Sequence, residues 1–204
     1  MIAVVDYGVN NVKSVVRALL AGGHPAELTA EPDVVRRADR VLLPGVGNFG
    51  QGTTNLMQSG LGDAVRAVAG AGRPVMGICL GLQLCLAESD EAPEARGLGL
   101  LPGRVRRLEV ALPVPHVGWA EVRPTAAGRA HPVLQGVNGG EFFYHVHSYH
   151  PAGLPNDAVL ATADYGYVFP TIVGQDNVIG AQFHPEKSQR AGIELLSAFA
   201  RWSP

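Results

Sequence analysis

The sequence has few charged residues and almost no excess of either sign. Only 17% of its 204 residues are Asp, Glu, Lys or Arg, and 16 basic against 18 acidic side chains leave a formal charge of −2. Proteins that bind mainly nucleic acid or an anionic membrane surface carry a basic excess that this chain lacks. We therefore expect neither nucleic acid nor a membrane among its partners.

Long apolar runs are also absent. No stretch approaches the roughly 18 apolar residues that span a bilayer. The first residues, Met1 to Val5, meet the acid Asp6 without the basic and apolar regions of a signal peptide. These features predict a soluble, cytoplasmic protein.

Cysteine is scarce, with only Cys79 and Cys85 in the chain. Six residues of helix would separate them by about 9 Å, which is too far for a disulfide. No Cys-x-x-Cys pair is present, so a zinc ribbon and a thioredoxin-type motif are excluded. We expect two free thiols in a reducing compartment.

What the sequence does contain is apolar content of 47%, with 26 glycines and 15 prolines. The apolar content excludes disorder, and so many glycines and prolines argue against a helical bundle. Buried strand patterns alternate with helical spacing in the first 90 residues, and short β-like runs follow Pro93, which indicates a sheet that is parallel first and antiparallel later. We predict one α/β domain over residues 1–204, with a central mixed, mainly parallel sheet flanked by helices. The expected strands are Ile2–Asp6, Ala26–Thr29, Arg40–Leu43, Pro74–Ile78, Val105–Leu108, Val117–Val122, Phe142–Val146, Val159–Thr162, Thr171–Val173 and Val178–Phe183. The expected helices are Val12–Leu20, Pro32–Ala38, Leu56–Ala69 with a break near Gly60, Leu80–Ala87 and Ala191–Trp202.

The segment Gly77-Ile78-Cys79-Leu80-Gly81 lies between a predicted strand and a predicted helix. Its glycine spacing is that of the G-x-S-x-G nucleophile elbow, with a thiol in place of the hydroxyl. Side chains at the flanking positions would collide in so sharp a turn, and the helix N-terminus favours a thiolate. The alternative is a buried structural cysteine, which is how we interpret Cys85.

A thiol nucleophile needs an imidazole to handle its proton and an acid to orient that imidazole. His184-Pro185-Glu186 follows a predicted strand, and in extended chain residues two apart project to the same side. We therefore expect Glu186 near the ring of His184, at the sheet edge where α/β sites gather. The alternative is a solvated pair in a loop.

The loop from Pro44 to Gly50 contains a literal G-x-G-x-x-G after a strand. The acid that a dinucleotide fingerprint requires about 20 residues later is missing, so NAD binding is not expected. Flexible glycines can instead turn peptide N–H groups toward a substrate oxyanion. Plain turn chemistry remains the alternative.

Three histidines crowd the segment from Tyr144 to His150. His145 and His147 share a strand face, but His150 does not, and no Cys or carboxylate is nearby, so zinc is not expected. We interpret the segment as a strand that leads into a polar loop lining a pocket.

Together these motifs resemble the class I (triad) glutamine amidotransferases, and within them the glutaminase subunits of imidazole glycerol phosphate synthase. The thiol, base, acid and oxyanion loop are all present. The more specific strings are Asp6-Tyr7-Gly8-Val9-Asn10-Asn11, Pro44-Gly45-Val46-Gly47-Asn48-Phe49, Pro115-His116-Val117-Gly118-Trp119, Val146-His147-Ser148-Tyr149 and Gln182-Phe183-His184-Pro185-Glu186-Lys187-Ser188. Members often carry Met where Val117 stands and Asn where Ala120 stands, which puts local packing near the partner in question.

The resemblance implies that Cys79 attacks the amide of glutamine, that His184 moves the protons and that Glu186 orients the imidazole. Backbone N–H groups of Val46 and Leu80 would hold the oxyanion. The residues implied around the bound glutamine are Gly47, Gln83, His147, Ser148 and Tyr149, and those implied near the partner are Asn11, Trp119 and Lys187.

The implied partner is a (β/α)₈-barrel cyclase subunit, bound as a heterodimer, which uses the released ammonia in histidine biosynthesis. The resemblance implies no cofactor and no metal. Two enzymatic alternatives are another triad glutaminase, such as the one serving pyridoxal phosphate synthesis, and a stand-alone hydrolase. The complete set of Cys79, His184 and Glu186 argues against a non-catalytic interaction module.

Overall fold

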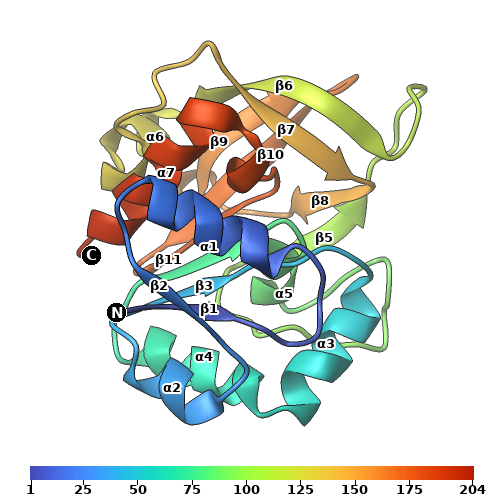
Figure 1. Cartoon of the computed structure of the whole chain (residues 1–204). Coiled ribbons are helices and arrows are strands. Elements are labelled where there is room, and N and C mark those ends of the chain that lie inside the picture. Colours follow the sequence, from blue (N-terminus) through green and yellow to red (C-terminus); the bar gives the residue numbers. More distant parts are fainter.

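The computed structural model describes residues 1–204, and its centre is a nine-stranded sheet in the order β2-β1-β3-β4-β11-β10-β9-β6-β7 (Figure 1). The first five strands in this order are parallel to one another. They are β2 (Ala26–Thr29), β1 (Ile2–Val5), β3 (Arg40–Leu43), β4 (Val75–Ile78) and β11 (Val178–Ala181). Their continuous apolar runs suit strands that are covered on both faces.

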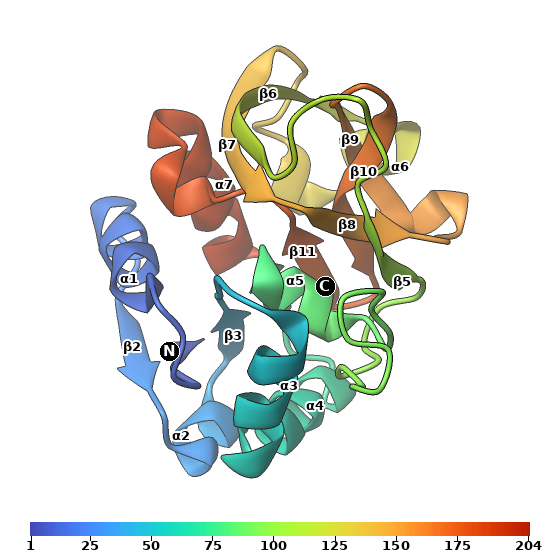
Figure 2. The same cartoon turned by 90° about the vertical axis from the view of Figure 1, so that its right-hand side faces the viewer.

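Helices cover the two faces of this parallel half (Figure 2). On one side α1 (Val12–Ala21) and α7 (Gln189–Arg201) pack against alternate strand residues such as Val4 and Leu42. The other alternate residues, such as Val5 and Leu43, face the helices α2 (Pro32–Arg37), α3 (Phe49–Gln58), α4 (Leu61–Gly70) and α5 (Leu80–Cys85). The period of two along each strand thus divides the core into two layers.

The other half of the sheet is antiparallel. It consists of β10 (Val168–Gln175), β9 (Val159–Asp164), β6 (His116–Pro124) and β7 (Glu141–His147). A separate pair, β5 (Arg104–Arg107) and β8 (Tyr149–Ala152), is also antiparallel. Short helical segments complete the chain: α6 (Ala126–Ala130) and the 3-10 turns Pro132–Leu134, Asn156–Ala158 and Pro185–Lys187. The mixed sheet with a parallel first half and antiparallel additions confirms the predicted fold class.

Some element boundaries differ from the sequence prediction. The helix expected from Leu56 begins at Phe49, because the Asn48 side chain accepts a hydrogen bond from the Gln51 N–H at 3.1 Å and caps it. The expected break near Gly60 is present and separates α3 from α4. Residues 149–152 form β8, where we had expected a polar loop.

The strands β4 and β11 are neighbours, and this pairing positions the site. Ile78 lies opposite Ala181 in parallel register, and the Cys79 N–H donates to the Ala181 carbonyl at 2.8 Å. Residues that follow these two strands therefore meet at one edge of the sheet. None of the helices combines the length and apolar content of a membrane span.

Candidate active site

Cys79 is the first residue after β4 and stands in a strained backbone conformation, with φ 53° and ψ −108°. Such angles are costly for a residue with a side chain and persist where the surroundings enforce them. A Cβ on Gly81 would lie 1.8 Å from the Leu43 carbonyl oxygen, and one on Gly77 would lie 2.6 Å from Leu82 Cα. The two glycines therefore let α5 pack tightly against the sheet, and the turn projects Cys79.

His184 follows β11, and its ring nitrogen Nδ1 lies 2.7 Å from Glu186 Oε1. Both side chains are almost completely buried. Asn11, at the start of α1, donates a hydrogen bond from its side chain to the same Glu186 oxygen at 2.5 Å. The predicted closeness of Glu186 to the His184 ring is confirmed, but the chain after His184 is not extended: Pro185–Lys187 forms a 3-10 turn that returns the carboxylate to the ring.

The charge state of His184 depends on opposing effects. Burial lowers the pKa of the imidazole, but interactions with Cys79 and Glu186 outweigh burial and raise the pKa from 6.5 to about 10. The other ring nitrogen, Nε2, is buried and makes no hydrogen bond of ordinary geometry, although Cys79 is close enough to act on the pKa. The arrangement favours an imidazolium beside the sulfur.

Cys79 opens onto a cavity of about 470 Å³. The cavity is lined by Val46, Gly47, Cys79, Leu80, Gln83, Glu91, Pro115, Val146, His147, Ser148, Tyr149 and Lys187. The structure thus brings all five expected substrate-binding residues and both expected oxyanion residues to the same space as the thiol. Glu91 was missed, since no local pattern distinguishes this single acid. One of its carboxylate oxygens accepts a hydrogen bond from the Phe49 N–H at 2.7 Å.

The glycine-rich loop lies against the elbow. The Leu80 N–H, an expected oxyanion donor, instead donates to the Gly45 carbonyl at 3.3 Å, while the Val46 N–H makes no hydrogen bond within the chain. A Cβ on Gly45 would lie 2.2 Å from the Tyr7 hydroxyl, so any larger residue here would require Tyr7 to move. Sequence reasoning missed Tyr7, whose pKa is raised by burial and by the two cysteines.

The histidine cluster lies beside this cavity and is buried. His145 and His147 share a face of β7, and the His116 ring stacks on that of His145 with centroids 5.0 Å apart. His147 Nδ1 lies 2.9 Å from the Tyr149 carbonyl, which can only accept, so Nδ1 carries the proton and Nε2 is left as an unpartnered acceptor. Burial lowers the pKa of His147 well below its ordinary value, with neighbouring histidines adding to the effect. No group of three or more His, Cys, Asp or Glu side chains is arranged as a metal site.

The residues expected near a partner are placed in two different ways. Trp119 is 47% exposed on β6, with its ring edge-on to Tyr144 at 6.1 Å, and the exposed Lys187 places its ammonium 5.7 Å from the centre of the Tyr144 ring. The side chain of Asn11, in contrast, donates a hydrogen bond to Glu186 within the site.

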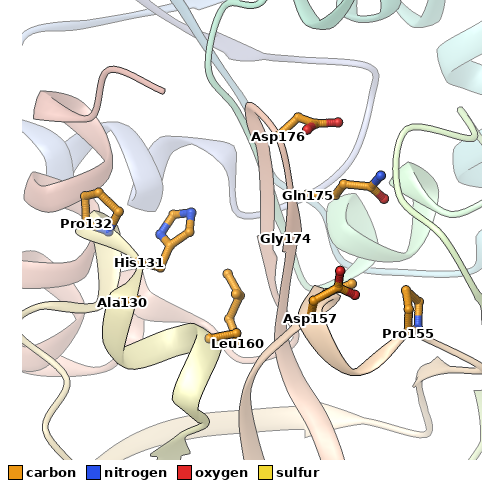
Figure 3. A pocket seen from close by; sticks show the side chains of 11 residues that line it. Ala130, His131, Pro132, Pro155, Asp157, Leu160, Gly174, Gln175 and Asp176 are labelled. Atoms are coloured by element: carbon orange, nitrogen blue, oxygen red, sulfur yellow. The ribbon is translucent and has the colours of Figure 1, made fainter.

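A second cavity of about 530 Å³ lies elsewhere, between α6, the 3-10 turn at Asn156–Ala158 and the turn after β10 (Figure 3). Its wall includes His131, Asp157 and Asp176. No cysteine lies there, and His131 Nδ1 accepts a hydrogen bond from the Val133 N–H at 3.2 Å. The cavity at Cys79 is therefore the stronger candidate for an active site.

Comparison with known proteins agrees with this geometry. The family model described as "Glutamine amidotransferase class-I" matches residues 3–201. The chain belongs to the class I glutamine amidotransferase family. Within this family it is 49% identical to the imidazole glycerol phosphate synthase subunit HisH of Symbiobacterium thermophilum, over 98% of the chain and 93% of the relative. It is 45% identical to the subunit of the same name from Moorella thermoacetica, over 97% and 93%.

Solved structures support the amidotransferase fold. A crystal structure of a glutamine amidotransferase superposes with a TM-score of 0.74 at 21% identity, over 95% of this chain and 98% of that one. The structure of PurLQS from Thermotoga maritima gives a TM-score of 0.78 at 18% identity, over 97% and 96%. At such low identity these likenesses concern the fold alone.

Proposed function

We propose that this protein hydrolyses glutamine at Cys79 and passes the ammonia to a cyclase subunit that makes imidazole glycerol phosphate in histidine biosynthesis. One observation carries the proposal: a strained cysteine that lines a cavity interacts with a buried His184–Glu186 pair, and the two follow adjacent parallel strands. The relationship to the HisH subunits supports the identity of the partner reaction.

The proposed reaction has two steps, formation of a thioester and its hydrolysis. The Cys79 sulfur attacks the side-chain carbonyl carbon of glutamine, and the tetrahedral intermediate collapses to a thioester as its nitrogen takes a proton from His184 and leaves as ammonia. Water then attacks the thioester and gives a proton to His184. The carbon–sulfur bond breaks, glutamate is released, and the Cys79 thiolate and the His184 imidazolium are restored. Glu186 holds the ring and stabilises its positive charge throughout.

The cavity has groups that suit the α-amino acid end of glutamine. Glu91 offers a carboxylate to the α-ammonium, and the amide oxygen of Gln83 is free to accept because only its nitrogen is engaged. Lys187 supplies a cation at the same cavity. These charges provide the orientation that a small polar substrate requires.

The oxyanion site is not open in this conformation. Leu80 and Val46 are its proposed backbone donors, and the Leu80 N–H is occupied by the Gly45 carbonyl. Rotation of the peptide at Gly45 would free one donor, and peptides beside glycine rotate at low steric cost. The resting chain is therefore proposed to be a weak glutaminase.

The proposed partner surface is the outer face of β6 and β7. Val117 is 58% exposed, Trp119 47% and Phe142 53%, and all three lie on these paired strands. Exposed apolar side chains gathered in this way are typical of a protein interface. Lys187, directly after Glu186 and beside Tyr144, connects this surface to the catalytic residues.

The test is to replace each cysteine in turn. Cys79→Ala is expected to abolish glutamine hydrolysis, while the complex with the cyclase still makes product from ammonium salts, because acceptor chemistry belongs to the partner. Cys85→Ala is the matched control and should be nearly silent, since burial raises the pKa of Cys85 to about 12 and keeps it protonated. Labelling by iodoacetamide at Cys85 but not at Cys79 would contradict the proposal.

A further inference from the structure

Two buried amides link the sulfur of Cys79 to the wall of the cavity. Gln182, which is 0% exposed, donates from Nε2 to Cys79 Sγ at 3.7 Å. Its oxygen Oε1 accepts from Gln83 Nε2 at 3.1 Å, and the same Gln83 nitrogen donates to the Tyr149 carbonyl at 3.2 Å. Neither the sequence motifs nor the proposed reaction gives Gln182 a role.

The orientation of both amides follows from the Tyr149 carbonyl, which is the one group in this series of hydrogen bonds that cannot donate. The Tyr149 carbonyl only accepts, so the amide of Gln83 must turn its nitrogen toward it. That nitrogen also faces Gln182, which must therefore present its oxygen to Gln83. The nitrogen of Gln182 is then left on the side of the sulfur, where it can act only as a donor.

The backbone holds this contact in place. Gln182 directly follows β11, and its N–H donates to the Thr171 carbonyl at 2.8 Å. The Cys79 N–H donates to the Ala181 carbonyl, also at 2.8 Å. The donor and the sulfur are thus fixed by neighbouring strands, and little rotation is needed to keep them together.

We propose that Gln182 is a positioning residue that holds the Cys79 sulfur in its reactive rotamer and stabilises the thiolate, and that Gln83 sets the orientation of Gln182. This inference rests on the proposed role of Cys79 as nucleophile. A neutral donor suits the position, since it favours the charged sulfur without adding a cation that would compete with His184 for Glu186. Gln83 would therefore act on both the substrate and the nucleophile.

Several other ionisable groups interact with Cys79 or line the same cavity, and the test must separate their effects from that of Gln182. Tyr7 follows β1, His184 and Lys187 follow β11, Glu91 follows α5, and His147 ends β7. None of them is changed when Gln182 is replaced. A change of pH profile in a Gln182 variant is therefore assigned to the lost amide donor.

The experiment measures two quantities on the purified full chain and on its complex. Alkylation of Cys79 by iodoacetamide is followed from pH 5 to pH 10, and kcat and KM for glutamine are determined for the complex. Gln182→Leu removes the donor, and Gln182→Glu keeps the shape but replaces the donor with an acceptor. Gln175→Leu, at an exposed glutamine at the end of β10, is the matched control.

Both Gln182 variants are expected to move the alkylation profile about one pH unit or more toward alkaline pH, because a hydrogen bond to the charged form is lost. The expected fall in kcat is about tenfold or more, with KM within about twofold. Gln182→Glu should show the larger shift, since its carboxylate repels the thiolate. Gln175→Leu should leave both quantities unchanged.

An unchanged alkylation profile in both variants would overturn the inference, whether or not the variants lose stability. A rise in KM with kcat and profile unchanged would also overturn it and assign Gln182 to substrate binding. If the wild-type complex does not hydrolyse glutamine, the proposed function fails, yet the alkylation profile still tests the contact between Gln182 and Cys79. The two failures are therefore distinguishable.

Discussion

Glu186 receives both His184 and Asn11 on one carboxylate oxygen, while its other oxygen is buried without a partner. In the proposed reaction the carboxylate orients the imidazole, and the imidazole itself moves the proton. We predict that His184→Ala lowers kcat roughly 1,000-fold or more, nearly as much as loss of the thiol. Glu186→Gln should cost less, because members of a triad act as a unit and the orienting acid is the mildest loss. Steady-state hydrolysis measures both, and full activity in His184→Ala with loss in His147→Ala would move the base to the histidine cluster.

The same pair predicts a pH dependence of stability. The pKa of His184 is raised from 6.5 to about 10, so its imidazolium stabilises the fold fully below pH 6.5 and loses this contribution as the pH rises through about 10. The difference in free energy of unfolding between wild type and Glu186→Gln is therefore expected to shrink over this window. Urea denaturation at pH 6 to 10 measures the difference, and a constant value contradicts the assignment.

Some residues of the candidate site could be predicted from local sequence patterns, and others could not. Cys79 and the His184–Glu186 pair stand in short patterns, the first set by glycines and the second by two-residue spacing. Tyr7 and Glu91 reach the site from distant segments, and no local pattern distinguishes them. Tyr7 and Glu91 lie near Cys79 because of the order of the strands in the sheet, and no local sequence pattern predicts that order.

At the scale of elements, the elbow depends on how closely α5 approaches β3. We predict that Gly81→Ala destabilises the fold by about 2–4 kcal/mol, because its Cβ would lie 1.8 Å from the Leu43 carbonyl oxygen, which is a backbone atom and cannot move aside cheaply. Gly70→Ala, in α4 with open space around it, is the matched control and should be neutral or slightly stabilising. Thermal denaturation compares them. Equal melting temperatures for the two variants would show that the close packing at Gly81 is not required.

Elements were predictable where one pattern dominates. Ala26–Thr29 and Arg40–Leu43 are strands with the predicted bounds. Gly50 was predicted to lie in a loop, yet it lies in α3 together with Gly52, where a Cβ on Gly52 would be 3.1 Å from Leu80 Cδ2. These glycines permit close packing rather than a turn. The strand β8 tolerates Pro151 because it pairs only with the short strand β5.

At the scale of the whole molecule, the sheet connects the cavity at Cys79 to the exposed apolar surface on β6 and β7. Its parallel half ends at the cavity with Cys79, and its antiparallel half exposes the apolar side chains of β6 and β7. His147 ends β7 at the cavity, and His116, opposite it, begins β6. A partner on β6 and β7 would therefore press on strands that line the active site.

This arrangement predicts that the isolated chain is a poor glutaminase and that a bound cyclase activates it. Free ammonia is lost at neutral pH, so hydrolysis without an acceptor would waste glutamine. We propose that the occupied Leu80 N–H restrains the isolated chain, because one missing oxyanion donor costs about 2.7 to 4 kcal/mol, or roughly 100- to 1,000-fold in rate. Docking at β6 and β7 would turn the Gly45 peptide and free that donor.

Glutamine turnover in three states tests this activation: the chain alone, the complex, and the complex with the cyclase's own ligand. Turnover is expected to rise from each state to the next, by about 100- to 1,000-fold overall, with most of the change in kcat because the oxyanion exists only along the reaction. Trp119→Ala should weaken the complex while leaving the low activity of the isolated chain unchanged, since its side chain lies outside the cavity. Equal turnover in all three states would exclude the restraint and leave a stand-alone hydrolase as the better account of the same triad.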